Sequence, residues 1–175
     1  MERYTNAILM ALDNENWYGA LFIALGLPDI CGHIEDKIKG SEKRYVNWYE
    51  RYMLSKYTKP VGPDQTLHVF LSGADCYALR CSYFHEGDSK IDHQRARKVL
   101  SDFIFVEPIQ DGVGMHMNQI NDTLQLNVRE FYMDMCNSVN EWVEKAVNNN
   151  QDYLGRINEQ LLKIRDVSGG LSFPL

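Results

Sequence analysis

The stretch "SGADCYALRCSYFHEG", residues 72 to 87, carries the signals for both ends of one helix. Ser72 and Asp75 fit a capping box, in which the serine accepts a hydrogen bond from the backbone and the acid three residues later reaches back. Gly87 supplies the left-handed residue at which helices commonly stop. We therefore predict a helix over residues 73 to 86.

The residues before this helix are also helical in pattern. Asp13 or Asn14 can cap a helix that begins near Trp17, and we expect Gly26-Leu27-Pro28 to break or kink it before a shorter helical stretch over residues 30 to 38. The apolar run before the proline is too short to cross a bilayer and predicts a buried helix. The N-terminus lacks the apolar region and cleavage site of a signal peptide, so we expect a cytoplasmic protein without membrane contact.

Another helix is expected to begin at Ser41, which would cap it. Its large side chains recur at spacings of three and four residues and so form one stripe: Tyr45, Trp48, Tyr49, Tyr52 and Met53. Such a stripe is usually core or a dimer interface, and a base-stacking platform is the less common use. Residues 58 to 64, "TKPVGPD", predict a loop.

After residue 100 the pattern changes from helical to alternating. Three short segments, "DFIFVEP", "GVGMHM" and "TLQLNV", predict an antiparallel hairpin or three-stranded insert over residues 102 to 128. A helix follows, with an apolar stripe formed by Val128, Phe131, Tyr132, Met135, Val139, Trp142, Val143 and Ala146. We expect a last helix over residues 153 to 164 and a loose tail, "SGGLSFPL". The predicted fold is mainly α, one helical bundle over residues 1 to 175 with a small antiparallel β insert.

Composition limits the partners that the chain can bind. It has 175 residues, of which 45% are hydrophobic, and a formal net charge of −6, which argues against coating nucleic acid through bulk electrostatics. Residues 37 to 59 nevertheless hold seven basic and two acidic side chains, a band that fits either a phosphate backbone or a solvated helix face. Cys31, Cys76, Cys81 and Cys136 form no CxxC pair, so we expect reduced, buried thiols.

Arg80 and His85 define the chemistry that the predicted helix offers. A histidine can take a proton from a ribose 2′-hydroxyl or give one to a leaving oxygen, while a guanidinium stabilises the charge that builds on the phosphate. Because only RNA carries this internal nucleophile, such a site would cut RNA and spare DNA. Five residues of helix turn the direction by about 140°, so a second copy across a two-fold axis would help to bring the two groups together.

The segment "YALRCSYFHEG" resembles the signature helix of the HEPN superfamily, whose recurring element is an arginine, a short spacer and a histidine within an α-helical bundle. On this resemblance Arg80 and His85 occupy the motif positions. The resemblance implies a homodimer whose paired motif helices form a composite cleft. It also implies a metal-independent ribonuclease, of the kind found in bacterial toxin, phage-defence and RNA-processing systems, although other members bind nucleotides or act as inactive adaptors.

One residue departs from the family pattern. Many active members have asparagine, aspartate or histidine directly after the arginine, where this chain has Cys81. Because a thiol is a poor hydrogen-bonding support for a phosphate, a non-catalytic nucleotide-binding or adaptor module is the alternative. With RNA or a nucleotide as the partner, we expect Tyr77, Cys81 and Ser82 to support Arg80 and His85.

Structural roles for the same residues stay open at this point. Arg80 can form an ion pair with Asp75 or Glu86, and His85 is favoured by the helix dipole at a C-terminus. A helical interaction protein with no ligand would keep the arginine and histidine side chains remote from each other.

A metal site is not predicted. Cys81 and His85 lie at helical spacing, with Cys76 and His93 nearby, but zinc prefers closely spaced ligand pairs on two elements. His116, on an expected strand, could join the site, although a histidine between methionines is more often structural. We expect neither metal nor cofactor.

Overall fold

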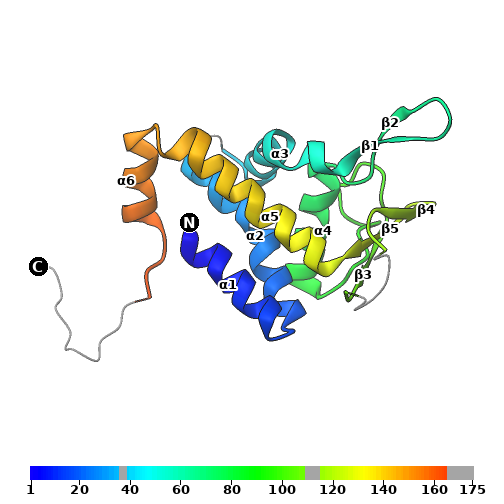
Figure 1. The fold of residues 1–175 in the computed structure, drawn as a ribbon, viewed down its shortest axis with the longest axis horizontal. Coiled ribbons are helices and arrows are strands. Elements are labelled where there is room, and N and C mark those ends of the chain that lie inside the picture. The colour runs from blue at the N-terminus through cyan, green and yellow to red at the C-terminus, as the bar shows by residue number, and fades with distance from the viewer. Residues whose placement is uncertain (36–38, 109–114, 165–175) are drawn as a thin grey trace, which may run out of the picture.

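Six α-helices and two small β-sheets make up the part of the chain that the computed structural model describes, residues 1–35, 39–108 and 115–164. The helices form the body of the molecule, and the sheets lie at the end opposite α6 (Figure 1). The helical elements are α1 (Glu2–Asp13), α2 (Trp17–Glu35), α3 (Ser41–Tyr52), the 3₁₀ turn η1 (Leu54–Tyr57), α4 (Gly73–Glu86), α5 (Val128–Trp142), the π-helical turn η2 (Val143–Val147) and α6 (Gln151–Gln160). The mainly helical fold predicted from the sequence is confirmed.

Helix α2 is the central helix and contacts α1, α3, α4, α5 and α6. It runs without interruption through Pro28, so of the two predicted alternatives, a break or a kink, the break is wrong. Pro28 is itself buried, and apolar packing on both sides of it offsets the one hydrogen bond that its missing N–H removes. The cap is Asn16, whose Oδ1 accepts the Gly19 N–H at 3.1 Å, rather than either residue predicted.

By length and composition α2 would also suit a membrane span, although half of that window is buried within the protein. This burial fits its place in the core.

Helix α3 packs closely against α2. A Cβ on Gly32 of α2 would lie 2.8 Å from the Arg44 carbonyl oxygen, so only glycine permits this approach. The aromatic stripe of α3 is core: Tyr45, Trp48, Tyr49 and Met53 are fully buried and Tyr52 is half-buried. Ser41 is the first residue of the helix and not its cap, because its hydroxyl is within 2.8 Å of the Tyr77 hydroxyl on α4.

Helix α4 has the predicted bounds. The Ser72 hydroxyl accepts the Asp75 N–H at 3.1 Å, and Gly87 is left-handed with φ of 69°. The Asp75 carboxylate reaches back only to the Ser72 side chain, whose hydroxyl donates to Asp75 Oδ2 at 2.6 Å. Its Oδ1 instead accepts the backbone N–H groups of residues 98, 99 and 100 at 2.6, 3.0 and 3.3 Å. The cap therefore also ties the following segment to the helix.

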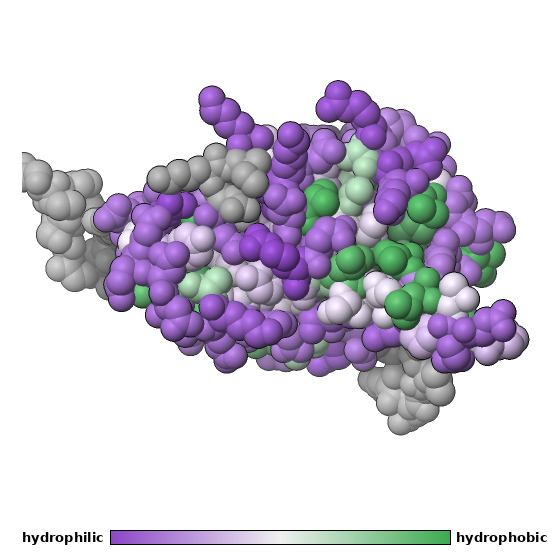
Figure 2. Space-filling view, turned by 90° about the horizontal axis from the view of Figure 1, so that it is seen from above, coloured by the Kyte–Doolittle hydropathy of each residue, from purple (hydrophilic) through white to green (hydrophobic). Residues whose placement is uncertain are grey.

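The predicted loop over residues 58 to 64 is wrong for residues 58 to 61, because β1 (Thr58–Val61) pairs antiparallel with β2 (Thr66–Val69) in a hairpin, and residues 62 to 64 lie in its turn. The hairpin projects from the body (Figure 1) and exposes Val61, Leu67 and Val69. Seen from above, the molecule is largely hydrophilic, and hydrophobic side chains gather in the half nearer the hairpin (Figure 2). Along β1 and β2, exposed side chains do not alternate with buried ones. The sequence therefore lacks the period of two residues that would predict these strands.

The predicted insert is a three-stranded sheet with order β3-β5-β4. Its strands are β3 (Asp102–Val106), β4 (Asn118–Ile120) and β5 (Thr123–Asn127). The β4–β5 pair is antiparallel, but β3 pairs parallel to β5, so the sheet is mixed and not antiparallel as predicted. The long connection from β3 to β4 allows the parallel pairing. Part of the "GVGMHM" segment lies outside the described residues. Strand β4, the second of the three along the chain, begins directly after this segment.

Helix α5 contacts α2 and buries six of the eight residues of the predicted apolar stripe, and the other two, Val143 and Ala146, are half-buried in η2. Asn127 caps it by accepting the Glu130 N–H at 3.2 Å. Helix α6 begins before the predicted start because the Asn150 side chain caps it, accepting the N–H groups of Asp152 and Tyr153. The "SGGLSFPL" tail lies outside the described residues.

Candidate functional site

Four of the five predicted site residues lie on the side of α4 that faces solvent, and the exception is Ser82. Tyr77, Arg80, Cys81 and Phe84 are half-buried there, and His85 is exposed. At about 100° per residue, this face runs from Arg80 on one flank to His85 on the other, with Cys81 between them. The opposite side of the helix is buried. One chain therefore presents both motif residues outward, on opposite flanks of the same face.

The Arg80 guanidinium is positioned by two contacts with α2 and α4. Its Cζ lies 4.8 Å from the centroid of the Phe84 ring, which stacks on Phe22 of α2 at 4.0 Å. Its Nη2 is 3.8 Å from Asp29 Oδ2, which is longer than a hydrogen bond. Asp29 Oδ1 already accepts a hydrogen bond from Arg44 at 3.1 Å. Asp29 therefore balances the charge of Arg80 without occupying its N–H donors.

Those donors have no acceptor among the described residues, and Nε is buried without one. The two acids predicted as partners of Arg80 bind elsewhere, because Asp75 binds backbone N–H groups and Glu86 pairs with His93 at 3.1 Å. An unsatisfied guanidinium at a partly exposed position is able to bind an anion.

The His85 side chain is exposed in the last turn of α4, one residue before the helix ends. Within the described part of the chain it makes no hydrogen bond, ion pair or ring contact. Its ring nitrogens are therefore available to solvent or to a ligand, which a proton-transfer group requires.

Tyr77 and Cys81 have different surroundings. The Tyr77 hydroxyl lies 2.8 Å from the Ser41 hydroxyl, and its ring meets Tyr45 edge-on at 5.3 Å. Burial raises the pKa of Tyr77, so it stays a neutral phenol. Tyr77 thus fixes α4 to the start of α3, whereas Cys81 is half-buried in the middle of the motif face.

Ser82 does not share the exposed face. Its side chain is fully buried, and its hydroxyl donates to the Lys90 carbonyl at 2.7 Å. It holds the segment after the helix rather than a ligand. Ser82 is therefore not part of the candidate site, which corrects the prediction.

The basic band contributes less free charge than its sequence suggests. Arg44 pairs with Asp29, and both terminal nitrogens of Arg51 pair with Glu35 at 2.5 and 2.8 Å. Lys37 lies outside the described residues. Two of the band's basic residues are thus occupied by acids of α2.

The remaining candidates have structural surroundings. His116 packs edge-on against Tyr57 at 5.8 Å, and its Nδ1 accepts the Asn127 N–H at 3.3 Å. Cys31, Cys76 and Cys136 are buried, and burial raises the pKa of Cys76 to about 12 and that of Cys136 to about 11. Within the described ranges, no group of three acidic, histidine or cysteine side chains is placed to hold a metal.

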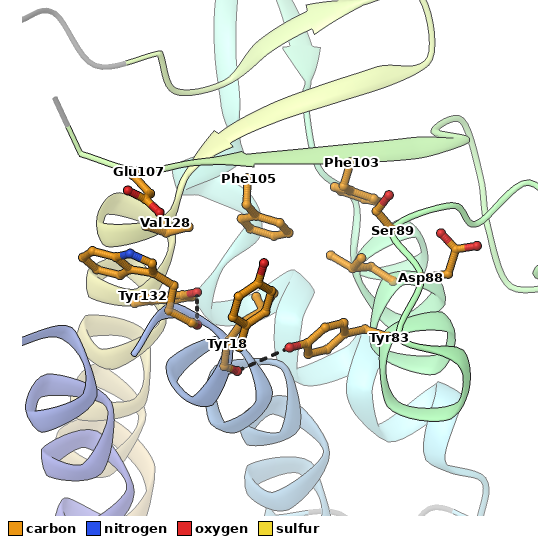
Figure 3. Close-up of a pocket in the computed structure, with 13 residues that line it drawn as sticks. Tyr18, Tyr83, Asp88, Ser89, Phe103, Phe105, Glu107, Val128 and Tyr132 are labelled. Carbon is orange, nitrogen blue, oxygen red and sulfur yellow. Dashed lines mark hydrogen bonds between the residues drawn. The ribbon is translucent and has the colours of Figure 1, made fainter. Parts of the chain in front are cut away.

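A cavity that the sequence did not predict lies beside α4. It has a volume of about 270 Å³, is partly open to solvent, and is lined by the start of α2, by α4 and α5 and by β3. Figure 3 shows Phe103 and Phe105 pointing down from β3 toward Tyr18 and Tyr83. These residues come from three separate elements, and no local motif in the sequence connects them. Neither Arg80 nor His85 lines this cavity.

No family model, curated protein or solved structure matches the chain.

Proposed function

We propose that the chain is a metal-independent ribonuclease of the HEPN type that acts as a homodimer. Arg80 and His85 are its catalytic residues, and Cys81 and Tyr77 lie beside them on the same face of α4. The observation that carries the proposal is that the partly exposed guanidinium of Arg80 and the exposed imidazole of His85 have no hydrogen-bond partner among the described residues.

The chemistry follows from these two groups. A phosphate that approaches Arg80 would satisfy N–H donors that Asp29, at 3.8 Å, leaves unused. The same donors would stabilise the additional negative charge of the pentacovalent phosphate. His85 would take the proton of the 2′-hydroxyl or give one to the 5′-oxygen, and the RNA fragment would end in a cyclic phosphate.

A second copy of the chain would complete the site. Arg80 and His85 occupy opposite flanks of the exposed face of α4, at about 140° from each other. A two-fold axis near Cys81 would place the histidine of one subunit beside the arginine of the other. Each dimer would then contain two equivalent composite sites.

A second candidate function is a non-catalytic nucleotide-binding or adaptor module. Two observations favour it. Cys81, a poor hydrogen-bonding group, lies at the centre of the motif face. Asp29 lies close enough to compete with a phosphate for Arg80.

The test is cleavage of end-labelled single-stranded RNA in the presence of EDTA. We expect fragments with cyclic phosphate ends and no cleavage of DNA of the same sequence. Arg80→Ala or His85→Ala should each lower the rate by at least about a hundredfold, with little change in Tm. His93→Ala is the matched control, because His93 is another exposed histidine near the end of α4 and lies outside the proposed site.

Two outcomes would count against the ribonuclease. If the purified double variant Arg80→Ala/His85→Ala cuts RNA at an undiminished rate, the assignment of the catalytic residues fails. If several RNAs stay intact while the protein binds mononucleotides in an Arg80-dependent way, the non-catalytic module replaces the enzyme.

A further inference from the structure

The cavity between α2, α4, α5 and β3 has a lining of unusual composition. Six of its 13 lining residues are aromatic, and they are Trp17, Tyr18, Tyr83, Phe103, Phe105 and Tyr132. At about 270 Å³ the cavity lies just below the range of about 300–1,000 Å³ that is usual for drug-sized ligands. Its size therefore suits a small ligand or the head group of a larger one.

The polar groups of the cavity are acidic. Asp88 and Glu107 line it, and none of its lining residues is basic. A neighbouring hollow shares Trp17 and Glu107 and adds Asp13 and Glu15, with Arg129 as its one basic residue. Four carboxylates against one guanidinium give this region a negative potential, which repels phosphates and attracts cations. The cavity thus differs in charge preference from the proposed phosphate site on α4.

Two of the three tyrosine hydroxyls of the cavity donate to backbone carbonyls, and the third, that of Tyr18, points into the cavity. Tyr132 donates to the Trp17 carbonyl at 2.7 Å, and Tyr83 donates to the Tyr18 carbonyl at 3.4 Å. Figure 3 shows both bonds at the floor of the cavity, while the Tyr18 ring stands up toward Phe105. Since these two donors are used, the lining offers a ligand aromatic rings and carboxylate oxygens.

We propose that this cavity binds a small organic cation with a methylated ammonium head. Aromatic rings attract such a cation through their quadrupoles, and the interaction strengthens where water is excluded. A methylated head group has no N–H that would need an acceptor, so a mostly apolar lining with acids at its rim suits it. This proposal does not depend on ribonuclease activity, because the residues of the two sites do not overlap.

The experiment titrates the full-length protein with choline and, separately, with trimethyllysine, by calorimetry and by tryptophan fluorescence. Trp17 lines the cavity, whereas Trp48 and Trp142 are fully buried in the core, so a fluorescence change reports mainly on this site. We expect the cations to bind at least about tenfold more tightly than 3,3-dimethylbutan-1-ol, the uncharged carbon analogue of choline. Binding should weaken as salt is added, and inorganic phosphate should not bind.

Three variants locate the site. Glu107→Gln and Asp88→Asn should each weaken cation binding at least about threefold, and the asparagine keeps an oxygen for the Lys90 N–H that Asp88 now accepts. Tyr18→Ala should weaken it further, and Tyr18→Phe should not, because the ring supplies the attraction. Tyr18 is 77% exposed, so its removal leaves the core intact. Glu144→Gln, in the turn η2 that follows the far end of α5, is the matched control.

Several results would overturn the proposal. Equal affinity for choline and its uncharged analogue would show that the cavity is merely apolar. Absence of heat and of a fluorescence change with both cations at about 50 mM would show that no such site exists. If cation binding were unchanged in both Glu107→Gln and Tyr18→Ala, the cation would bind outside this cavity.

Discussion

At the scale of single residues, burial controls the protonation of His116. Burial lowers the pKa of this histidine, and nearby Asp134 and Glu130 oppose the shift without reversing it. The folded protein therefore favours the neutral ring, which packs on Tyr57 and accepts the Asn127 N–H. In the unfolded chain the same ring has a pKa of about 6.5 and binds a proton more readily.

This difference predicts that the protein loses stability on acidification. The unfolded state takes up more protons as the pH falls below about 6.5, so the free energy of unfolding decreases from there toward the lower folded-state pKa. His116→Gln removes this contribution and keeps an acceptor within reach of Asn127. Urea unfolding at pH 7.5 and 5.5 should show a smaller loss for the variant than for the wild type. An equal loss in both proteins would contradict the assignment.

At the scale of elements, α4 is attached on three sides. Tyr77 fixes it to α3, Arg80 faces Asp29 of α2, and Asp75 holds the backbone of residues 98 to 100. Gly73 lies so close to α3 that an added Cβ would be 3.1 Å from Glu50 Oε1. The helix is thus held rigidly enough to present its outward face in one geometry.

Asp75 is expected to be the most costly of these attachments to remove. Asp75→Ala would leave three backbone N–H groups without their acceptor, in surroundings where Asp75 itself is only 2% exposed. We expect a loss of about 2–4 kcal/mol in the free energy of unfolding. Chemical denaturation measures it, with Asp64→Ala in the exposed hairpin turn as the control. A loss as small as that of the control would show that the carboxylate is dispensable.

At the scale of the whole molecule, an apolar strip on α2 borders the motif face. Tyr18 is 77% and Phe22 is 50% exposed, and Phe22 stacks on Phe84, which lies beneath Arg80. In the proposed dimer, with its axis near Cys81, Phe22 would be covered by the α4 of a second copy on its His85 flank. The hairpin exposes a separate apolar group, Val61, Leu67 and Val69, at the other edge of the molecule.

The dimer is tested by light scattering after size-exclusion chromatography. We expect a mass close to twice the 20.3 kDa of the chain. Phe22→Glu should give a monomer, because the interface would bury a carboxylate without a partner, and RNA cleavage should disappear with the dimer. Leu67→Glu, a similar change at a 70% exposed residue of the hairpin, should stay dimeric. A monomeric wild type at high concentration would contradict the proposal. If only Leu67→Glu were monomeric, the interface would lie at the hairpin instead.

The sequence by itself determined the elements whose signals lie within a few residues of each other. Ser72 and Gly87 define α4 to the residue, and the stripe beginning at Tyr45 identifies the buried face of α3. Caps and periodic stripes act through contacts within one or two helical turns, so they can be recognised without knowledge of the rest of the fold. The separation of about 140° between Arg80 and His85 around the helix followed from the same local geometry.

Only the tertiary structure decided the features that depend on residues distant in the chain. The continuation of α2 through Pro28 depends on packing that outweighs a local cost of about 3 kcal/mol. The contact of Arg80 with Asp29 rather than with an acid of its own helix arises because α2 lies beside α4. The aromatic and acidic cavity joins α2, α4, α5 and β3, and its residues share no spacing that the sequence displays. Such contacts form only when long-range packing brings separate elements together. A short segment of sequence therefore carries no signal for them.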